Sequence, residues 1–102
     1  MAVVSDKVAC RTPAEGRDGV TNIPAWKFDL LQGTIKDVLT NGPIKFGDLK
    51  NAVGKRLSED DLARLGSLGW HVTTVKLEME VRGEIVRLEV NGPQQIAWAG
   101  DA

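Results

Sequence analysis

The apolar residues between positions 24 and 41 repeat with the period of an α-helix, and this pattern constrains the fold more than any other feature of the sequence. Phe28, Leu31 and Ile35 are spaced by three and four residues, and the apolar pair at positions 38 and 39 continues the stripe. Pro24 suits the first turn of a helix, where a missing N–H costs nothing. In the Asn-Gly-Pro run at residues 41–43, the glycine can adopt the left-handed conformation of a helix cap, and the proline cannot continue the helix. The sequence therefore predicts an amphipathic helix that ends before Pro43.

A second, shorter helical stripe follows, in which Leu49, Val53 and Leu57 recur at helical spacing. Ser58 with an acid three residues later is similar to a capping box, and residues 59–61 are all acidic, which favours a helix N-terminus. The acidic cluster is also a candidate metal site. Consecutive carboxylates on a helical turn point in different directions, and no histidine or further acid is near in the sequence. We therefore interpret the cluster as a helix start.

The charge of the chain is balanced overall but uneven along its length. The 102 residues carry 13 basic and 14 acidic side chains, a formal net charge of −1. Residues 22–57 hold 6 basic and 3 acidic residues, whereas residues 58–102 hold 4 and 8. This distribution excludes a uniformly basic nucleic-acid binder and predicts that an anionic partner contacts the 22–57 side.

Residues 1–22 mix small, polar and charged residues without a period, so we expect an N-terminal arm or extension there. Cys10 is the only cysteine, which excludes an intrachain disulfide and a multi-cysteine metal cluster. The start of the chain has no apolar run of signal-peptide length, and no stretch approaches the roughly 20 apolar residues of a membrane span. We therefore expect a cytoplasmic protein with no membrane contact.

The stretch from Val75 to Arg82 is ambiguous, because apolar and charged residues alternate strictly in it. Taken alone, this alternation predicts a β-strand and, with Ile85 to Val90, a hairpin. The same residues are good helix formers, and Val75 and Met79 also fit a helical stripe. Periodicity leaves both structures open.

Two sequence blocks carry a resemblance that bears on this choice. The first, Gly42-Pro-Ile-Lys-Phe-Gly-Asp-Leu-Lys50, resembles the winged helix-turn-helix pattern of bacterial transcription regulators. The second, Gly69-Trp-His-Val-Thr-Thr-Val-Lys-Leu-Glu-Met-Glu-Val-Arg-Gly-Glu-Ile85, is similar to a family of short, uncharacterised bacterial proteins of the winged helix-turn-helix type. The resemblance covers about residues 20 to 98. It implies an α+β winged helix-turn-helix fold with three helices and a small antiparallel C-terminal wing.

In detail, the resemblance implies a helix over about residues 71–82, capped by Gly83. It also implies wing strands at 85–90 and 95–98, joined by a turn at residues 91–93. The winged-helix domain would span 23–98, and residues 99–102 would form a tail.

The resemblance also implies that the domain binds duplex DNA and is a small transcriptional regulator, because the start of a recognition helix reads bases while flanking cations hold phosphates. The candidate contact residues are His71, Thr73, Thr74 and Lys76 on the helix, Lys45, Lys50, Lys55 and Arg56 before it, and Arg87 in the wing.

Carboxylates argue against this function. Glu78, Glu80 and Glu84 lie on or beside the same helix and oppose binding to phosphate. The alternative is a winged-helix module for protein interaction or dimerisation that does not bind DNA. No catalytic group, metal ligand set or cofactor motif is expected, since His71 is isolated and Gly66-x-x-Gly69 lacks the Lys and Ser/Thr of a phosphate loop.

In the helical arrangement, Leu77 and Val81 lie off the inward stripe. We expect the N-terminal arm or a second subunit of a homodimer to cover them. The predicted core consists of Trp26, Phe28, Leu31, Ile35, Leu49, Val53, Leu62, Val75, Met79, Ile85 and Trp98.

Overall fold

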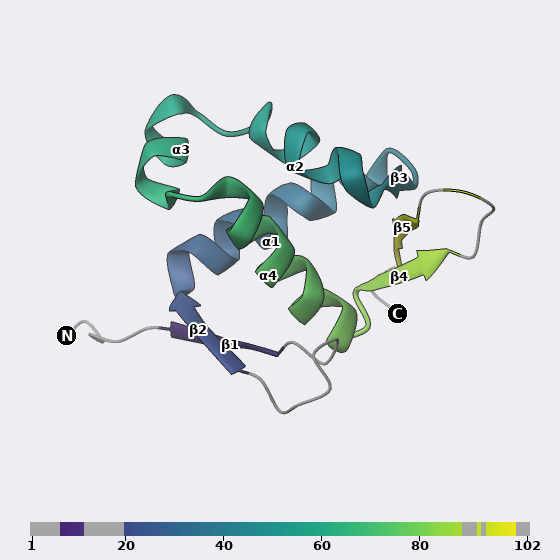
Figure 1. Cartoon of the computed structure of the whole chain (residues 1–102), viewed down its shortest axis with the longest axis horizontal. Helices are drawn as coiled ribbons and strands as arrows, with labels where there is room; N and C mark the ends of the chain where they lie inside the picture. The colour runs from purple at the N-terminus through teal and green to yellow at the C-terminus, as the bar shows by residue number, and fades with distance from the viewer. Residues whose placement is uncertain (1–6, 12–19, 89–91, 93, 100–102) are drawn as a thin grey trace.

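Helix α4 (Leu68–Val81) crosses the middle of the molecule and contacts most of the other elements (Figure 1). The computed structural model describes residues 7–11, 20–88, 92 and 94–99. Along the chain the remaining elements are β1 (Lys7–Arg11), β2 (Val20–Pro24), α1 (Ala25–Thr40), β3 (Ile44–Lys45), α2 (Phe46–Gly54), α3 (Glu59–Leu65), β4 (Ile85–Leu88) and β5 (Gln95–Trp98).

Helix α1 has the buried face that its spacing predicts. Phe28, Leu31 and Ile35 are all buried, together with the apolar pair at 38 and 39. The helix ends where Asn41 serves as C-cap and Gly42 adopts φ +124°, which a residue with a side chain rarely adopts. The prediction of an amphipathic helix ending before Pro43 is confirmed.

Helices α2 and α3 are separate, so the described part of the chain has four helices rather than the expected three. Ser58 starts α3, because its Oγ accepts a hydrogen bond from the backbone N–H of Asp61 at 3.0 Å, as the capping interpretation requires. Gly66 ends α3 with φ +89°. Ser67 then begins α4, accepting from the N–H of Trp70 at 3.3 Å. A cap and a glycine thus bound a seven-residue helix, whose predicted start at Ser58 is confirmed.

Helix α4 resolves the ambiguity of residues 75–82 in favour of the helix. Its end is a double turn in which the N–H of Gly83 bonds to the carbonyl of Glu80 at 3.1 Å and that of Glu84 to Met79 at 2.9 Å. Gly83 adopts φ +81° in this cap. The predicted cap at Gly83 is confirmed, and a hairpin through 72–90 is excluded.

The strands form two small antiparallel sheets. Strands β1 and β2 pair as a hairpin, with Cys10 opposite Thr21. The second sheet has the order β3-β5-β4, with Ile44 opposite Ile96 and Ile85 opposite Trp98. The wing strands were expected at 85–90 and 95–98, and β4 and β5 occupy 85–88 and 95–98. Residues 89–91 and 93, including most of the expected turn, lie outside the described residues.

The hairpin shows that part of the expected N-terminal arm belongs to the body of the protein. Cys10 and Ile23 are 0% and 2% exposed and join the main apolar cluster, and β1 packs against α4. Eight of the eleven predicted core residues are buried: Phe28, Leu31, Ile35, Leu49, Val53, Val75, Met79 and Ile85. Leu62 and Trp98 are half-buried, and Trp26 is 38% exposed. None of the described helices combines the length and the apolar character that crossing a bilayer requires.

Candidate nucleic-acid interface

Four of the expected contact residues are exposed cations on α2 and its flanks. Lys45 precedes the helix, Lys50 lies within it, and Lys55 and Arg56 follow its last residue. Within the part of the chain that the structure describes, none of the four has an ion-pair partner. Asp48, in the first turn of α2, is the carboxylate of this helix. The α2 surface therefore presents unneutralised positive charge, as the uneven charge distribution predicts.

Lys50 joins this basic surface to the start of α4. A Cβ atom placed on Gly69 would lie 3.6 Å from Cδ of Lys50 and 3.8 Å from its Nζ. Gly69 is the second residue of α4, so the Lys50 side chain lies across the first turn of that helix. A Cβ at position 69 would make ordinary van der Waals contact with the Lys50 side chain.

The residues expected to read DNA from α4 are mostly inside the protein. His71 and Thr74 are 8% and 6% exposed, and Lys76 is 2% exposed. The Nδ1 atom of His71 lies 2.6 Å from the carbonyl oxygen of Ser67, one turn earlier. These side chains are therefore not offered to a ligand at the surface, and Thr73 is the exposed member of the predicted set on α4.

Lys76 is buried because its charge is compensated inside the protein. Its ammonium pairs with the carboxylate of Glu80 and lies 4.1 Å from the centre of the Phe46 ring. Glu80 also accepts a hydrogen bond from Nε of Arg87 at 2.6 Å. One carboxylate thus partners both Lys76 and Arg87, so Arg87, although 46% exposed, is not an uncompensated cation.

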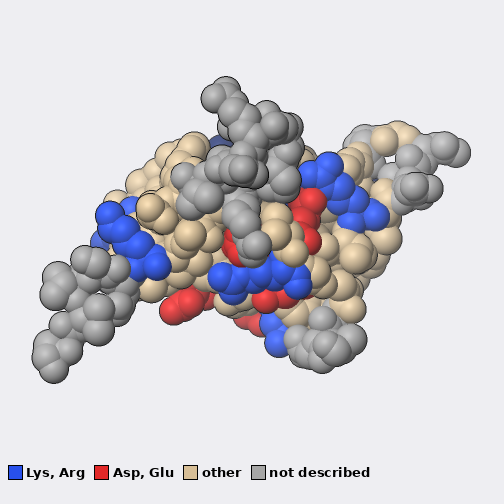
Figure 2. All heavy atoms as spheres, turned by 90° about the horizontal axis from the view of Figure 1, so that it is seen from below, with Lys and Arg blue, Asp and Glu red and all other residues tan. Residues whose placement is uncertain are grey.

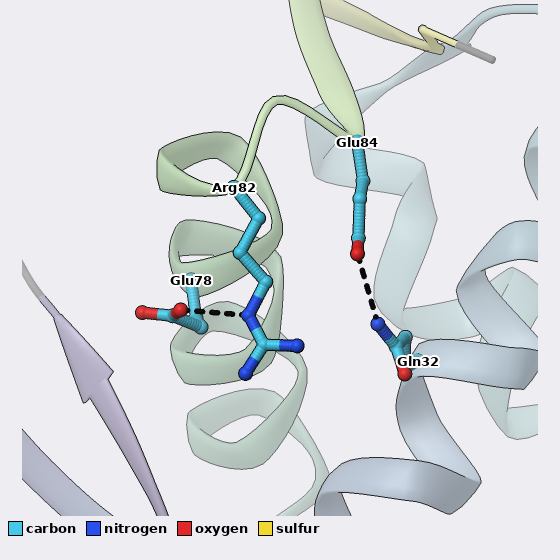
Figure 3. A network of polar contacts seen from close by, with 4 residues as sticks. All are labelled: Gln32, Glu78, Arg82 and Glu84. Carbon is cyan, nitrogen blue, oxygen red and sulfur yellow. Dashed lines mark hydrogen bonds and ion pairs between the residues drawn. The ribbon is translucent and has the colours of Figure 1, made fainter. Parts of the chain in front are cut away.

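A second polar group fixes the other end of α4 (Figure 3). Arg82 reaches back one turn and donates from Nε to Glu78 at 2.8 Å, and its guanidinium lies 4.7 Å from the centre of the Phe28 ring. Glu84, just after the helix, accepts from Nε2 of Gln32 on α1 at 2.9 Å. These contacts tie α4 and the start of β4 to α1.

Cys10 lies close to Glu78 and Arg82, and its thiol has low nucleophilic reactivity. Burial raises the pKa of its thiol to about 11, and the nearby carboxylate of Glu78 acts in the same direction, while Arg82 opposes it. The thiolate, which is the nucleophile, is therefore scarce near neutral pH. The described residues contain no group of three or more His, Cys, Asp or Glu side chains that could hold a metal ion.

Sequence reasoning missed the aromatic part of this surface. Trp70 is 49% exposed, and Trp26, which was predicted to lie in the core, is 38% exposed. Arg64 and Lys27 lie 4.7 Å and 5.6 Å from the centre of the Trp26 ring.

The opposite side of α4 has a different charge pattern. Figure 2 shows the molecule from the side of the β1–β2 hairpin, where basic and acidic side chains lie next to one another. Figure 1 shows α2 on the other side of α4 from this hairpin. The unpaired cations of α2 therefore distinguish that side from the hairpin side.

Comparison with curated proteins gives no match, and comparison with solved structures gives none either. Comparison with protein families gives a match over residues 7–96, from the start of β1 into β5. The matched region includes the hairpin, the four described helices and the basic surface of α2. The chain belongs to the family described as "Family of unknown function (DUF6958)".

Proposed function

We propose that this chain is a winged-helix domain that binds DNA through α2 and the exposed residues at the start of α4. The order α1, β3, α2, α3, α4, β4, β5 supports the winged-helix assignment, as does the strand order β3-β5-β4. In this arrangement α4 takes the place of the recognition helix, and β4 and β5 take the place of the wing.

The observation that carries the proposal is the set of uncompensated cations at Lys45, Lys50, Lys55 and Arg56. They are concentrated on one helix of a chain whose net charge is −1. Cations that bind phosphate release the counterions condensed on DNA, and this release supplies most of the affinity of non-specific binding. A cluster of this kind fits a phosphate backbone better than a neutral partner.

Helix α4 contributes few groups for reading sequence. Its exposed residues near the start are Trp70 and Thr73, and the half-buried Leu77 follows one turn later. Thr73 replaces Thr74 as the candidate for a base-edge contact, since the Thr74 side chain is buried. We therefore expect binding that depends strongly on salt and weakly on sequence.

The test is a fluorescence-anisotropy titration of a labelled random duplex at several salt concentrations between about 50 and 200 mM. Lys50→Ala and Lys55→Ala should each weaken binding and reduce the slope of log affinity against log salt by about 0.9. Lys7→Ala is the matched control, because Lys7 is an exposed cation on the hairpin. Absence of binding to both duplex and single-stranded DNA at about 50 mM salt would contradict the proposal.

A second candidate function, homodimerisation, is favoured by the apolar surface on the last turns of α4. Val81 is 37% exposed, and Leu77, one turn earlier on the same face, is half-buried. The β1 strand packs on α4 of its own chain and leaves Val81 exposed, so this face is a better candidate for the dimer contact than the arm. Sedimentation equilibrium of the wild type and of Val81→Glu tests it: a dimer that the substitution dissociates supports this function, and a monomeric wild type contradicts it.

A further inference from the structure

Trp70 is an exposed aromatic residue whose backbone and ring both contact neighbouring residues. It has the largest exposed fraction, 49%, among the large apolar side chains of the described residues. Its backbone N–H is held by the Ser67 hydroxyl, and its ring meets that of His71 edge to face, with centroids 4.8 Å apart and an angle of 84°. His71 is itself buried and lies against the Ser67 carbonyl. The ring of Trp70 is therefore held in place while about half of its surface contacts solvent.

Two lysine side chains lie near the backbone that precedes Trp70. Lys50 lies across Gly69, the residue before Trp70. On the α3 side, Nζ of Lys27 donates to the carbonyl of Leu65 at 3.1 Å. A Cβ on the next residue, Gly66, would lie 4.0 Å from Cε1 of His71, so the Lys27 ammonium is anchored close to the ring that supports Trp70.

The second exposed tryptophan at this end differs in one respect. The ring of Trp26 already has Arg64 and Lys27 against it, so cations occupy the positions that a stacked ligand would take. Nothing comparable covers Trp70 in the described residues, where its one ring contact is the edge-to-face contact with His71. On α3, Asp60 is paired with Arg64 at 3.9 Å, and Glu59 and Asp61 lie in the first turn, at the opposite end of the helix from Leu65.

We infer that Trp70 stacks on an unpaired base of DNA, so that this surface prefers single-stranded DNA to closed duplex. The inference rests on the proposed DNA-binding function and adds the form of the ligand. Surfaces that bind single strands combine a basic track for the backbone with aromatic side chains on which bases stack. Lys50 supplies a phosphate contact next to Trp70, and the remaining cations of α2 extend the track. In a closed duplex the faces of the bases are covered by their neighbours, and Trp70 gains no such contact.

The experiment compares a labelled oligo-dT strand with a duplex of equal length by fluorescence anisotropy at one low salt concentration. Trp70→Ala should weaken binding to the single strand roughly tenfold and weaken binding to the duplex by a clearly smaller factor. Trp70→Phe should restore most of the affinity, because a benzene ring also stacks. Trp26→Ala, the matched control, should leave binding to both ligands unchanged.

A second readout does not depend on removing Trp70. In a Trp26→Phe/Trp98→Phe variant Trp70 is the remaining tryptophan, since the chain has three. Its fluorescence should be quenched when oligo-dT is added, because a stacked base quenches an indole. Circular dichroism tests if each variant is folded. If Trp70→Ala does not fold, the quenching measurement alone decides the inference.

The outcomes separate the two proposals. If DNA is bound but Trp70→Ala binds oligo-dT as the wild type does, or the Trp70 fluorescence does not change on binding, the stacking inference is overturned and the DNA-binding proposal stands. If neither form of DNA is bound at low salt, both are overturned. Tighter binding to duplex than to oligo-dT would also overturn the stated preference.

Discussion

Replacing Gly83 by alanine tests the helix cap that decided the structure of residues 75–90. Gly83 has φ +81°, and an added Cβ would meet no atom within 4 Å, so the cost arises from the backbone conformation rather than from a clash. A residue with a Cβ in this conformation costs about 1–2 kcal/mol, and the lower chain entropy of the unfolded alanine variant offsets about 0.4–1 kcal/mol of that cost. We therefore expect Gly83→Ala to lower the free energy of unfolding by about 1 kcal/mol, a fall in Tm of about 4–8 °C for a domain of this size.

Gly33→Ala is the matched control with the opposite sign. Gly33 is exposed in the interior of α1, and an added Cβ again meets nothing within 4 Å. Alanine is favoured over glycine in a helix by about 1 kcal/mol, so this substitution should raise the free energy of unfolding. Urea denaturation of the two variants and the wild type measures both effects, and the variants should differ by about 2 kcal/mol. Equal midpoints for Gly83→Ala and the wild type would refute the left-handed cap.

Three further substitutions test the core, the buried ion pair and the buried thiol. Leu31→Ala, at a position that is 0% exposed, should cost about 2–5 kcal/mol in urea denaturation, and an unchanged midpoint would contradict the buried face assigned to α1. Lys76→Ala should cost about 1–3 kcal/mol, because Glu80 loses one of its two cationic partners, whereas Lys50→Ala should change stability by less than about 0.5 kcal/mol; equal effects would show that Lys76 is not a buried partner. Burial raises the pKa of Cys10 to about 11 from 9.0, so its contribution to stability is complete below pH 9 and is lost as the pH rises toward 11. Wild type should therefore lose more stability than Cys10→Ala over this range, and parallel pH profiles would contradict the assignment.

The parts of the fold that sequence predicts well are those where local signals agree. The apolar spacing of α1, its Asn-Gly-Pro end and the Ser58 cap each point to a local structure that the chain adopts. Residues 75–82 were different, because alternating apolar and charged residues fit a strand and good helix formers fit a helix. The resemblance to a family favoured the helix, and the structure has a helix there with its cap at Gly83.

The candidate site was harder to predict, because the sequence does not state which charges are compensated. Lys76 has the polar character of a surface residue, yet Glu80 one turn later and the Phe46 ring allow it to be buried. Glu78 is buried in the same way, with Arg82 one turn later. Both pairs have the i, i+4 spacing that places two side chains together on a helix, and this was the signal available in the sequence. Lys45, Lys50, Lys55 and Arg56 have no ion-pair partner among the described residues, and all four are exposed.

The hairpin could not be read from its own residues. Strand β1 has five residues, and its contribution to the core comes from Cys10, which a sequence reader assigns to an exposed leader. The position of β1 depends on pairing with β2, which follows later in the sequence, and on contact with α4. Neither interaction produces a periodic pattern in the residues of β1. Non-local pairing of this kind is where sequence patterns carry the least information.

The central position of α4 has a consequence for amide hydrogen exchange. The helix is in contact with α1, α2, α3, β1 and β4, so its middle turns cannot open to solvent while these neighbours stay in place. The amides around Val75 and Met79, two residues that are 0% exposed, should therefore exchange only through unfolding of the whole domain, and their protection should report its global free energy of unfolding. The amides of α3, a seven-residue helix, can exchange through smaller openings. Hydrogen exchange at several urea concentrations would thus rank the elements by the free energy of the opening that exposes their amides. The amides of α4 should be the last to exchange for deuterium.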